Sequence, residues 1–410
     1  MHLKKKLTII GINYYPEDTA IGLYTSQLAE YFNDENIEVS ILTGFPYYPS
    51  WEINEIYKNK SWFYQENING IQVFRYKQYV PKTPTFFKRI IHLLDFTFGT
   101  FINLFKIKEA DVVLCIVPFT STIFLGKILS KLKKAKLWVH IQDFEFDAAS
   151  DSDLTEKKSK TSVFFKTLFW IEEKLLKSAD IRSTISLSML RKLESKSFDK
   201  RSVLLPNWVD VDNINPEQAK THRYLNSKAF KILYSGNIGE KQDWNFFLEF
   251  AKSVRLNLNI EIIIIGDGSK RAWLEKKIID FNNVVLHSPV AYNELSDLLC
   301  SADLHILFQK VDVIDTVMPS KILAMMASQK PSLITGSLNS EVATIIEKSK
   351  SGAYFYSKDL SKVTEFVESL EKDKILGKEY GINARKYVSE HFSKVEVLKQ
   401  FKETIVKLTA

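Results

Sequence analysis

Glycine turns and two lysines are the features of the sequence best suited to binding a diphosphate. The segment SGNIGEKQDW (235–244) follows an apolar run, and Gly236 and Gly239 let the backbone approach a ligand closely. Lys241 stands near the start of the next predicted helix, where a cation normally opposes the helix dipole. An anion bound between the two makes that placement favourable, whereas the alternative is a solvated lysine in a glycine turn.

A second lysine stands at another predicted helix start, in DTVMPSKILAMMASQKP (315–331). Pro319 suits the first helical turn, and the free backbone amides of Ser320 and Lys321 can bind phosphate. The segment GDGSKRAWLE (266–275) repeats the order of strand, glycine turn and helix. It either positions a nucleotide base or merely turns the chain.

The N-terminal half has a polar cluster in HIQDFEFDAA (140–149), where His140 precedes Asp143, Glu145 and Asp147. A metal site is one interpretation, but no second histidine cluster supports it. Four polar groups directly after an apolar run favour a functional site over a structural histidine.

A glycine also opens a predicted helix near the N-terminus, in GINYYPEDTAIGLYT (11–25). The backbone amides after Gly22 suit a phosphate or a sugar hydroxyl. The spacing is not that of a dinucleotide fingerprint, and a plain strand–helix turn is the alternative.

The elements that must position these residues alternate between short apolar strands and amphipathic helices. Strands separated by helices of 10–15 residues require crossovers and therefore predict parallel sheets. The alternation of strands and helices resumes at residue 231 after a polar segment, 210–229, which we interpret as a linker. We therefore expect two doubly wound α/β domains, residues 1–209 and 210–378, with helices at 379–410 returning to the first. Ligands bind beyond the carboxyl ends of such strands, so a cleft between two facing domains is the expected site.

Composition is that of a globular protein, with 45% hydrophobic and 26% charged residues among 410. Two cysteines in apolar surroundings predict buried thiols in a reducing compartment. No run of about 18 uncharged apolar residues is present, so we expect a cytoplasmic protein without a spanning helix.

The net charge of +7 is concentrated in residues 82–136, which hold ten Lys or Arg and three acidic residues. Within it, 84–108 is apolar over most of its length but interrupted by charges, which predicts amphipathic helices. We expect an anionic membrane surface to contact residues 84–136. The alternative is a core helix beside a solvated lysine face. A nucleic-acid partner is not expected, because the region matches no known module.

With these residues in place, the chain resembles glycosyltransferase family 4, which has the GT-B fold. More narrowly, it resembles bacterial O-antigen, colanic-acid and capsule transferases, including N-acetyl-fucosaminyltransferases. The resemblance covers nearly the whole chain and implies two facing Rossmann-like doubly wound domains with an interdomain cleft. Its anchors, in family order, are GINYYPEDTAIGLYT, TGFPYYPSW, HIQDFEFDAA, LPNWVD, YSGNIGEKQ, GDGSKRAWLE and VMPSKILAMMASQKP.

The resemblance also implies residue roles, with His140, Lys241 and Lys321 as the catalytic groups. Gly22 would contact the donor phosphate or the acceptor, and His140 would hydrogen-bond the transferred sugar. The other implied donor contacts are Asn237, Lys241, Ser320 and Lys321 for the diphosphate, Asp267 and Gly268 near the nucleotide base, and Glu341 in the cleft lining. The chain departs from the family at Thr316 and Ala324, where two glutamates are usual, which puts the ribose contact in doubt.

The implied reaction is transfer, with retention, from a nucleotide-sugar, expected to be UDP-linked, to a lipid-diphosphate-linked saccharide at the inner face of the cell membrane. No cofactor or metal is expected, because lysines and helix amides can stabilise the leaving diphosphate. A sugar-nucleotide epimerase is one alternative, although it needs acid and base groups on both faces of the sugar. A non-catalytic sugar-nucleotide- or membrane-binding subunit is the other.

Overall fold

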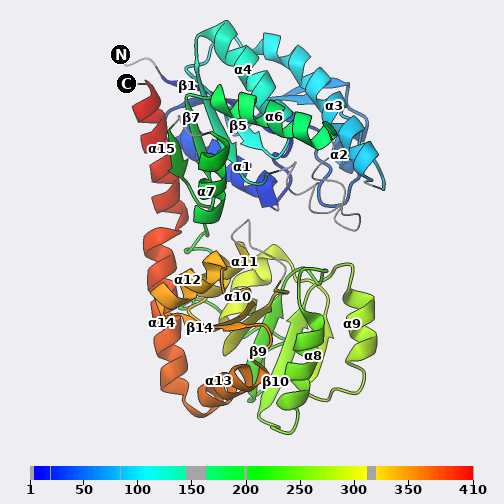
Figure 1. Ribbon diagram of the computed structural model, residues 1–410, viewed down its shortest axis with the longest axis vertical. Helices are drawn as coiled ribbons and strands as arrows, with labels where there is room; N and C mark the ends of the chain where they lie inside the picture. The colour runs from blue at the N-terminus through cyan, green and yellow to red at the C-terminus, as the bar shows by residue number, and fades with distance from the viewer. Residues whose placement is uncertain are drawn as a thin grey trace. The chain divides into compact units, whose positions relative to one another are not determined.

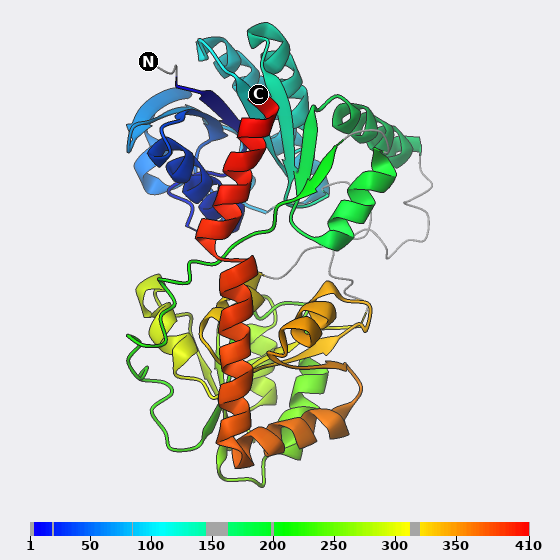
Figure 2. The same cartoon turned by 90° about the vertical axis from the view of Figure 1, so that its left-hand side faces the viewer.

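The computed structural model describes residues 4–18, 20–83, 85–144, 163–197, 201–311 and 320–409. The chain forms two compact units, one of Met1–Pro206 with Leu398–Ala410 and one of Asn207–Val397. Figures 1 and 2 show the last two helices, α14 (Lys374–His391) and α15 (Lys394–Thr409), following one another along the chain. The second unit thus includes all of α14, and the expected return point at residue 379 lies inside that helix.

Within the described residues, the first unit has an eight-stranded sheet in the order β3-β4-β2-β1-β5-β6-β7-β8. All neighbours pair in parallel except β3 and β4. The strands are β1 (Lys6–Ile10), β2 (Glu38–Gly44), β3 (Phe63–Ile68), β4 (Ile71–Tyr76), β5 (Val112–Val117), β6 (Lys136–Ile141), β7 (Ile181–Thr184) and β8 (Ser202–Leu204). The central strand β5, VVLCIV, is buried along its whole length because helices cover the sheet.

The helices of the first unit are α1 (Ala20–Asp34), α2 (Glu55–Lys58), α3 (Phe86–Asn103), η1 (Leu104–Lys106), α4 (Ser121–Lys133), α6 (Val163–Lys177) and α7 (Leu187–Lys196). The final helix α15 also packs on this unit, where the Phe401 ring lies 5.5 Å from that of Trp138 and 5.1 Å from that of His140. The middle of this helix is held there as well, since Lys402 forms an ion pair with Glu35 of the first unit.

The second unit has a parallel sheet in the order β11-β10-β9-β12-β13-β14. Its strands are β9 (Phe230–Ser235), β10 (Ile260–Ile265), β11 (Val284–His287), β12 (Leu304–Phe308), β13 (Ser332–Gly336) and β14 (Gly352–Tyr356). In order of appearance this is 3-2-1-4-5-6, the arrangement of dinucleotide-binding sheets. From β9, the chain adds β10 and β11 on one side of the sheet and then β12, β13 and β14 on the other side. The order of strand addition therefore changes sides between β9 and β12.

The helices of the second unit are α8 (Trp244–Ser253), α9 (Arg271–Lys277), η2 (Tyr292–Glu294), α10 (Leu295–Cys300), α11 (Ser320–Ala327), α12 (Glu341–Ser349), α13 (Leu360–Lys372) and α14. Helix α8 begins where the Asp243 side chain accepts a hydrogen bond from Phe246 N. The segment 210–229 is not a free linker, because it packs on this unit. The backbone N–H groups of Lys220 and His222 donate to Asp297 Oδ1 and Ser301 Oγ, at 2.8 Å each.

No helix within the described ranges has both the length and the apolar character needed to cross a membrane.

Candidate functional site

The candidate site of the second unit lies at the carboxyl ends of its strands, next to β9 and β12. This side of the sheet is called the carboxyl edge below. Where the order of strand addition changes sides, the loops that follow the two strands turn to opposite faces and leave a crevice for ligands. The turn Gly236–Lys241 follows β9, and α11 begins with Ser320 and Lys321 on the chain that leaves β12. Two segments predicted separately from the sequence therefore meet at one edge.

Lys321 is the charged group at the centre of this edge. Its Nζ donates to the Tyr234 hydroxyl at 3.0 Å and lies 4.3 Å from the centre of the Tyr234 ring. The Tyr234 hydroxyl in turn donates to the Asn237 carbonyl at 2.6 Å, so the end of β9 holds the lysine in place. Burial lowers the pKa of Lys321 from 10.5 to about 8, because the ammonium loses hydration.

Gly236 makes room for this lysine. Its φ of 137° is open to glycine but strained for other residues, and a Cβ added there would lie 2.5 Å from Lys321 Nζ. The next glycine turn approaches equally closely, because a Cβ on Gly266 would lie 2.0 Å from the Gly236 carbonyl oxygen. The absence of side chains thus lets the two turns and the lysine pack together.

The turns after β9 and β10 are joined to each other. Ile238 N donates to the Asp267 carbonyl at 2.7 Å, and a Cβ on Gly268 would lie 2.3 Å from Asn237 Oδ1. Gly268 has a φ of 150°, and its N–H donates to the Asp267 carboxylate at 2.7 Å. Asn237 and Asp267 are both exposed, so the structure places the predicted diphosphate and base residues side by side at the surface of this edge.

Lys241 is exposed near the start of α8 and has no carboxylate partner among the residues that the structure describes. The neighbouring Glu240 pairs instead with Lys270, at 2.8 Å, and more distantly with Lys310, at 3.8 Å. Because Glu240 is engaged by these two lysines, the amino group of Lys241 remains available to an anion.

Two further predicted residues stand at helix starts on the same edge. Ser320 is the first residue of α11, but its side chain and Pro319 lie outside the described residues. Glu341 is the first residue of α12, after Ser340 has capped the helix by accepting from Val342 N at 3.2 Å. Because α12 follows β13, the neighbour of β12, Glu341 lies on the far side of α11 from the glycine turns.

In the first unit, Gly22 packs against a buried carboxylate. A Cβ on Gly22 would lie 2.7 Å from the Cβ of Glu17. Glu17 accepts from Tyr47 N and Tyr48 N, both at 2.8 Å, and from the Asn13 side-chain amide at 2.8 Å. Burial raises the pKa of Glu17 above its usual value, although these donors favour the charged form. The structure thus gives Gly22 a packing role in addition to its predicted ligand contact.

His140 is enclosed at the end of β6, with 1% of its surface exposed. Nδ1 lies 2.8 Å from Ser183 Oγ, and Nε2 lies 3.1 Å from the Gln142 side-chain nitrogen, so both ring nitrogens are engaged. Burial lowers the pKa of His140 to about 3, which keeps the ring neutral at physiological pH. A hydrogen bond from His140 to the transferred sugar stays a prediction, and it requires one of these contacts to be exchanged.

The carboxylates after His140 fall largely outside the described residues, since these end at residue 144 and resume at 163. Thr316 lies in another such gap, while Ala324 lies on α11. The sequence interpretation did not single out Tyr234 and Glu17. Tyr234 holds Lys321 in the second unit, and Glu17 packs against Gly22 in the first. For Tyr234 the available signal was its position, because its hydroxyl-bearing side chain stands near the end of β9, two residues before Gly236.

Comparison with known proteins identifies the family of this chain. Residues 217–387 match the family model of glycosyl transferases group 1. Over 97% of its length the chain is 32% identical to an Escherichia coli K12 protein named as a colanic acid biosynthesis glycosyl transferase, WcaI, of which it covers 98%.

Solved structures with similar folds share much lower identity with this chain. Sucrose-phosphate synthase from Thermosynechococcus elongatus has a TM-score of 0.72 at 12% identity, with 99% of each chain covered. Anabaena HepE in complex with UDP has a TM-score of 0.68 at 13% identity, covering 98% of this chain and 100% of HepE. WaaG, a glycosyltransferase involved in lipopolysaccharide biosynthesis, has a TM-score of 0.66 at 14% identity, covering 97% and 99%. These likenesses confirm the predicted fold of two Rossmann-like α/β domains.

Proposed function

Because the chain belongs to the group 1 glycosyltransferase family, we propose that it moves a sugar from a UDP-sugar to a lipid-diphosphate-linked saccharide, with retention, during synthesis of a bacterial surface polysaccharide. The E. coli relative named for colanic acid biosynthesis supports the process, and the UDP bound to a protein of the same fold supports the donor. The observation that carries the proposal is Lys321, a half-buried ammonium at the carboxyl ends of the strands of the second sheet, which pairs with no carboxylate among the residues that the structure describes.

The proposed reaction places negative charge where the protein has unneutralised positive charge. The bond between the anomeric carbon and the donor diphosphate breaks, and a bond from that carbon to the acceptor oxygen forms on the same face. The acceptor's proton passes to the departing diphosphate. Lys321, Lys241 and the first amides of α11 stabilise that leaving group as its charge develops. A metal ion is not required for this step, because ammonium groups and backbone dipoles supply the stabilisation.

The proposed acceptor is attached to lipid, and the first unit offers a surface suited to membrane contact. Six large apolar side chains of α3 and η1 are exposed at spacings of three and four residues, so they form one continuous stripe along the helix. They are Phe87, Ile91, Leu94, Phe98, Ile102 and Phe105. An exposed apolar stripe of this length marks an interaction site in most proteins.

A basic stretch follows on the neighbouring helix and supports an anionic lipid surface as the proposed partner of this stripe. Helix α4 contacts α3, exposes Phe124 and Leu132, and ends in the lysine-rich stretch 131–136. Apolar side chains would enter the headgroup region while each lysine adds about 1 kcal/mol of attraction to anionic lipid. We therefore place the protein at the cytoplasmic face of the cell membrane as a peripheral enzyme.

Purified protein incubated with UDP- and GDP-sugars and a lipid-diphosphate acceptor tests the proposal. We expect UDP release that depends on the acceptor, and a product with the anomeric configuration of the donor by NMR. Faster release from a GDP-sugar would overturn the donor assignment, and an inverted product would overturn retention. Donor binding without hydrolysis or transfer under any condition would indicate a binding subunit rather than an enzyme.

A further inference from the structure

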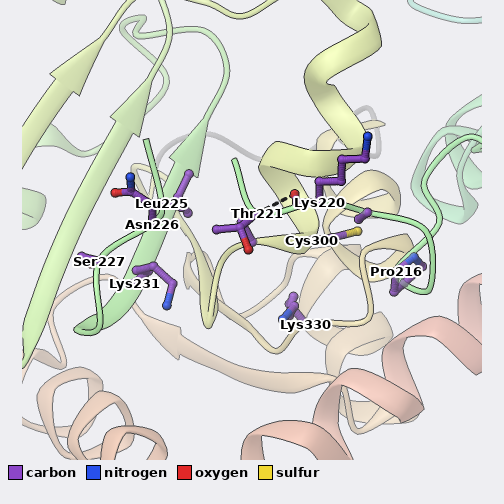
Figure 3. Close-up of a pocket in the computed structure, with 11 residues that line it drawn as sticks. Pro216, Lys220, Thr221, Leu225, Asn226, Ser227, Lys231, Cys300 and Lys330 are labelled. Carbon is purple, nitrogen blue, oxygen red and sulfur yellow. Dashed lines mark hydrogen bonds between the residues drawn. The ribbon is translucent and has the colours of Figure 1, made fainter. Parts of the chain in front are cut away.

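A polar cavity lies at the amino ends of the strands of the second sheet, opposite to the candidate site. It has a volume of about 390 Å³ and is lined by residues of the 216–231 segment, by Cys300 and Ser301 before β12, and by Lys330 before β13 (Figure 3). Lys231 and Gly236 stand at the two ends of β9, and five residues at about 3.3 Å each put them roughly 17 Å apart. The cavity is therefore separate from the glycine turns that the proposed transfer uses.

The cavity holds more positive than negative charge. Lys231 Nζ pairs with Asp303 at 2.6 Å, but Lys330 forms no ion pair with any carboxylate that the structure describes. Among the charged and titratable neighbours of Lys330, Asp303 and then Cys300 favour its charged form, whereas Lys231 and Lys378 repel it. Burial is the largest influence and lowers the pKa of Lys330 below its usual value. Asp303 is already paired with Lys231, so one carboxylate serves two half-buried ammonium groups, and a further anion would offset the positive charge that remains.

A structural explanation for Lys330 would be stabilisation of the preceding helix terminus. Helix α11 ends at Ala327, and a cation close to a helix C-terminus is favourable. Arg385 already fills that role, because its Nη1 donates to the Ala327 carbonyl at 2.7 Å. The need for a second cation at this terminus is correspondingly small.

We propose that this cavity binds a small phosphate-bearing anion, held by Lys330 and Lys231. An ammonium is a compact charge that suits phosphate, and lysine is a common phosphate ligand. Thr221 and Asn226 line the same cavity, and their side chains form no hydrogen bond within the described part of the chain, so they can add neutral donors. Lys220 contributes less, since its side chain extends away from Lys231 and Lys330 in Figure 3. The volume lies within the range of small-molecule sites.

Cysteine labelling gives a direct readout that does not depend on catalysis. Cys300 lines the cavity and is partly exposed, whereas Cys115, the other cysteine of the chain, is fully buried. Inorganic phosphate should slow the reaction of Cys300 with N-ethylmaleimide several-fold, while sodium chloride of equal ionic strength should not. Lys330→Gln should abolish this protection, and Lys276→Gln, an exposed lysine of α9, should retain it. Equal labelling rates with and without phosphate in the unmodified protein would overturn the proposal.

The same variants separate this cavity from the diphosphate edge and from a purely structural lysine. Lys321→Ala should keep the phosphate protection of Cys300, because Lys321 lies at the other edge. In phosphate-free buffer Lys330→Gln should raise the melting temperature, since it removes an unpaired charge, and it should lose the further rise that phosphate gives the unmodified protein. A lower melting temperature without phosphate, or protection that persists in Lys330→Gln, would overturn the proposal. Should Lys330→Gln fail to fold, Lys330→Arg keeps the charge and must retain the protection.

Discussion

Replacing Lys321 with Met tests whether this lysine supports turnover while lowering the free energy of unfolding. Its pKa of about 8 lies about 2.5 units below the ordinary value, and each unit corresponds to 1.36 kcal/mol. Holding the ammonium charged at pH 7 therefore costs about 3 kcal/mol. The variant gives up the contact with the Tyr234 ring, worth about 1 kcal/mol, and the hydrogen bond to its hydroxyl, worth about 1 kcal/mol. The hydroxyl still donates to Asn237, so we expect Lys321→Met to be about 1 kcal/mol more stable at pH 7.

The pH dependence of this difference has a definite sign. Because the folded pKa is lowered, the unfolded chain binds the proton more tightly between pH 8 and the ordinary value of 10.5. The unmodified protein therefore gains stability as pH rises through that window, and the advantage of the Met variant shrinks. Activity moves in the opposite direction, since loss of the Lys321 charge above pH 8 should lower kcat/KM. Bound diphosphate favours the charged lysine, so kcat should persist to higher pH.

Urea denaturation at pH 7 and pH 10, together with turnover of the preferred donor, measures both effects. We expect a more stable variant whose turnover is lower by about 10²-fold or more, the scale of losing one charge-stabilising group. Lys276→Met is the matched control and should change neither quantity. Unchanged turnover would remove Lys321 from the site. A variant less stable than the unmodified protein at pH 7 would show that the lysine is structural.

Three further outcomes follow from the same geometry. Lys241→Ala should lower turnover by about 10²-fold or more with little change in melting temperature, because its side chain is exposed, and a wild-type rate would exclude it from the site. Turnover should survive excess EDTA, and loss that Mg²⁺ or Mn²⁺ restores would identify the carboxylates after His140 as ligands. In liposome flotation, binding should rise with anionic lipid and fall with salt, and it should weaken when four lysines, Lys131, Lys133, Lys134 and Lys136, become Glu. Equal recovery on neutral and anionic vesicles would refute the electrostatic part.

The alternation of apolar strands and helices could be predicted wherever a strand is almost wholly apolar. β5 (VVLCIV) and β10 (IEIIII) are such strands, and both lie inside a parallel sheet. β3 gives no such signal, because FYQENI is polar and pairs only with β4 at the edge of the sheet. β14 is a short, partly exposed strand, GAYFY, that pairs only with β13 and lacks the aliphatic run of the inner strands. An edge position weakens the apolar signal without always removing it, since the edge strand β11 keeps an apolar sequence, VVLH.

The positions of the candidate residues followed from strand order, but their environments did not. The sequence could place His140 at the end of a strand, yet its enclosure depends partly on Phe401, which packs against its ring from α15 at the other end of the chain. It likewise could not show that Lys321 would lie against Tyr234, 87 residues earlier. Such contacts between distant segments set burial and pKa, and a sequence pattern reports only local neighbours.

The glycines show most clearly what residue type alone can and cannot indicate. Each was interpreted as part of a turn near a bound ligand, and in the structure a side chain of the protein lies beside each of three of them. Their ligand contacts stay predictions. Lys321 occupies the space beside Gly236, Asn237 lies against Gly268, and Glu17 lies against Gly22. A phosphate that reaches the turn after β9 would therefore meet the Lys321 ammonium as well as backbone amides. The missing side chains leave room for charged and polar groups, and Ala324, where a glutamate is usual, adds no negative charge that would offset them.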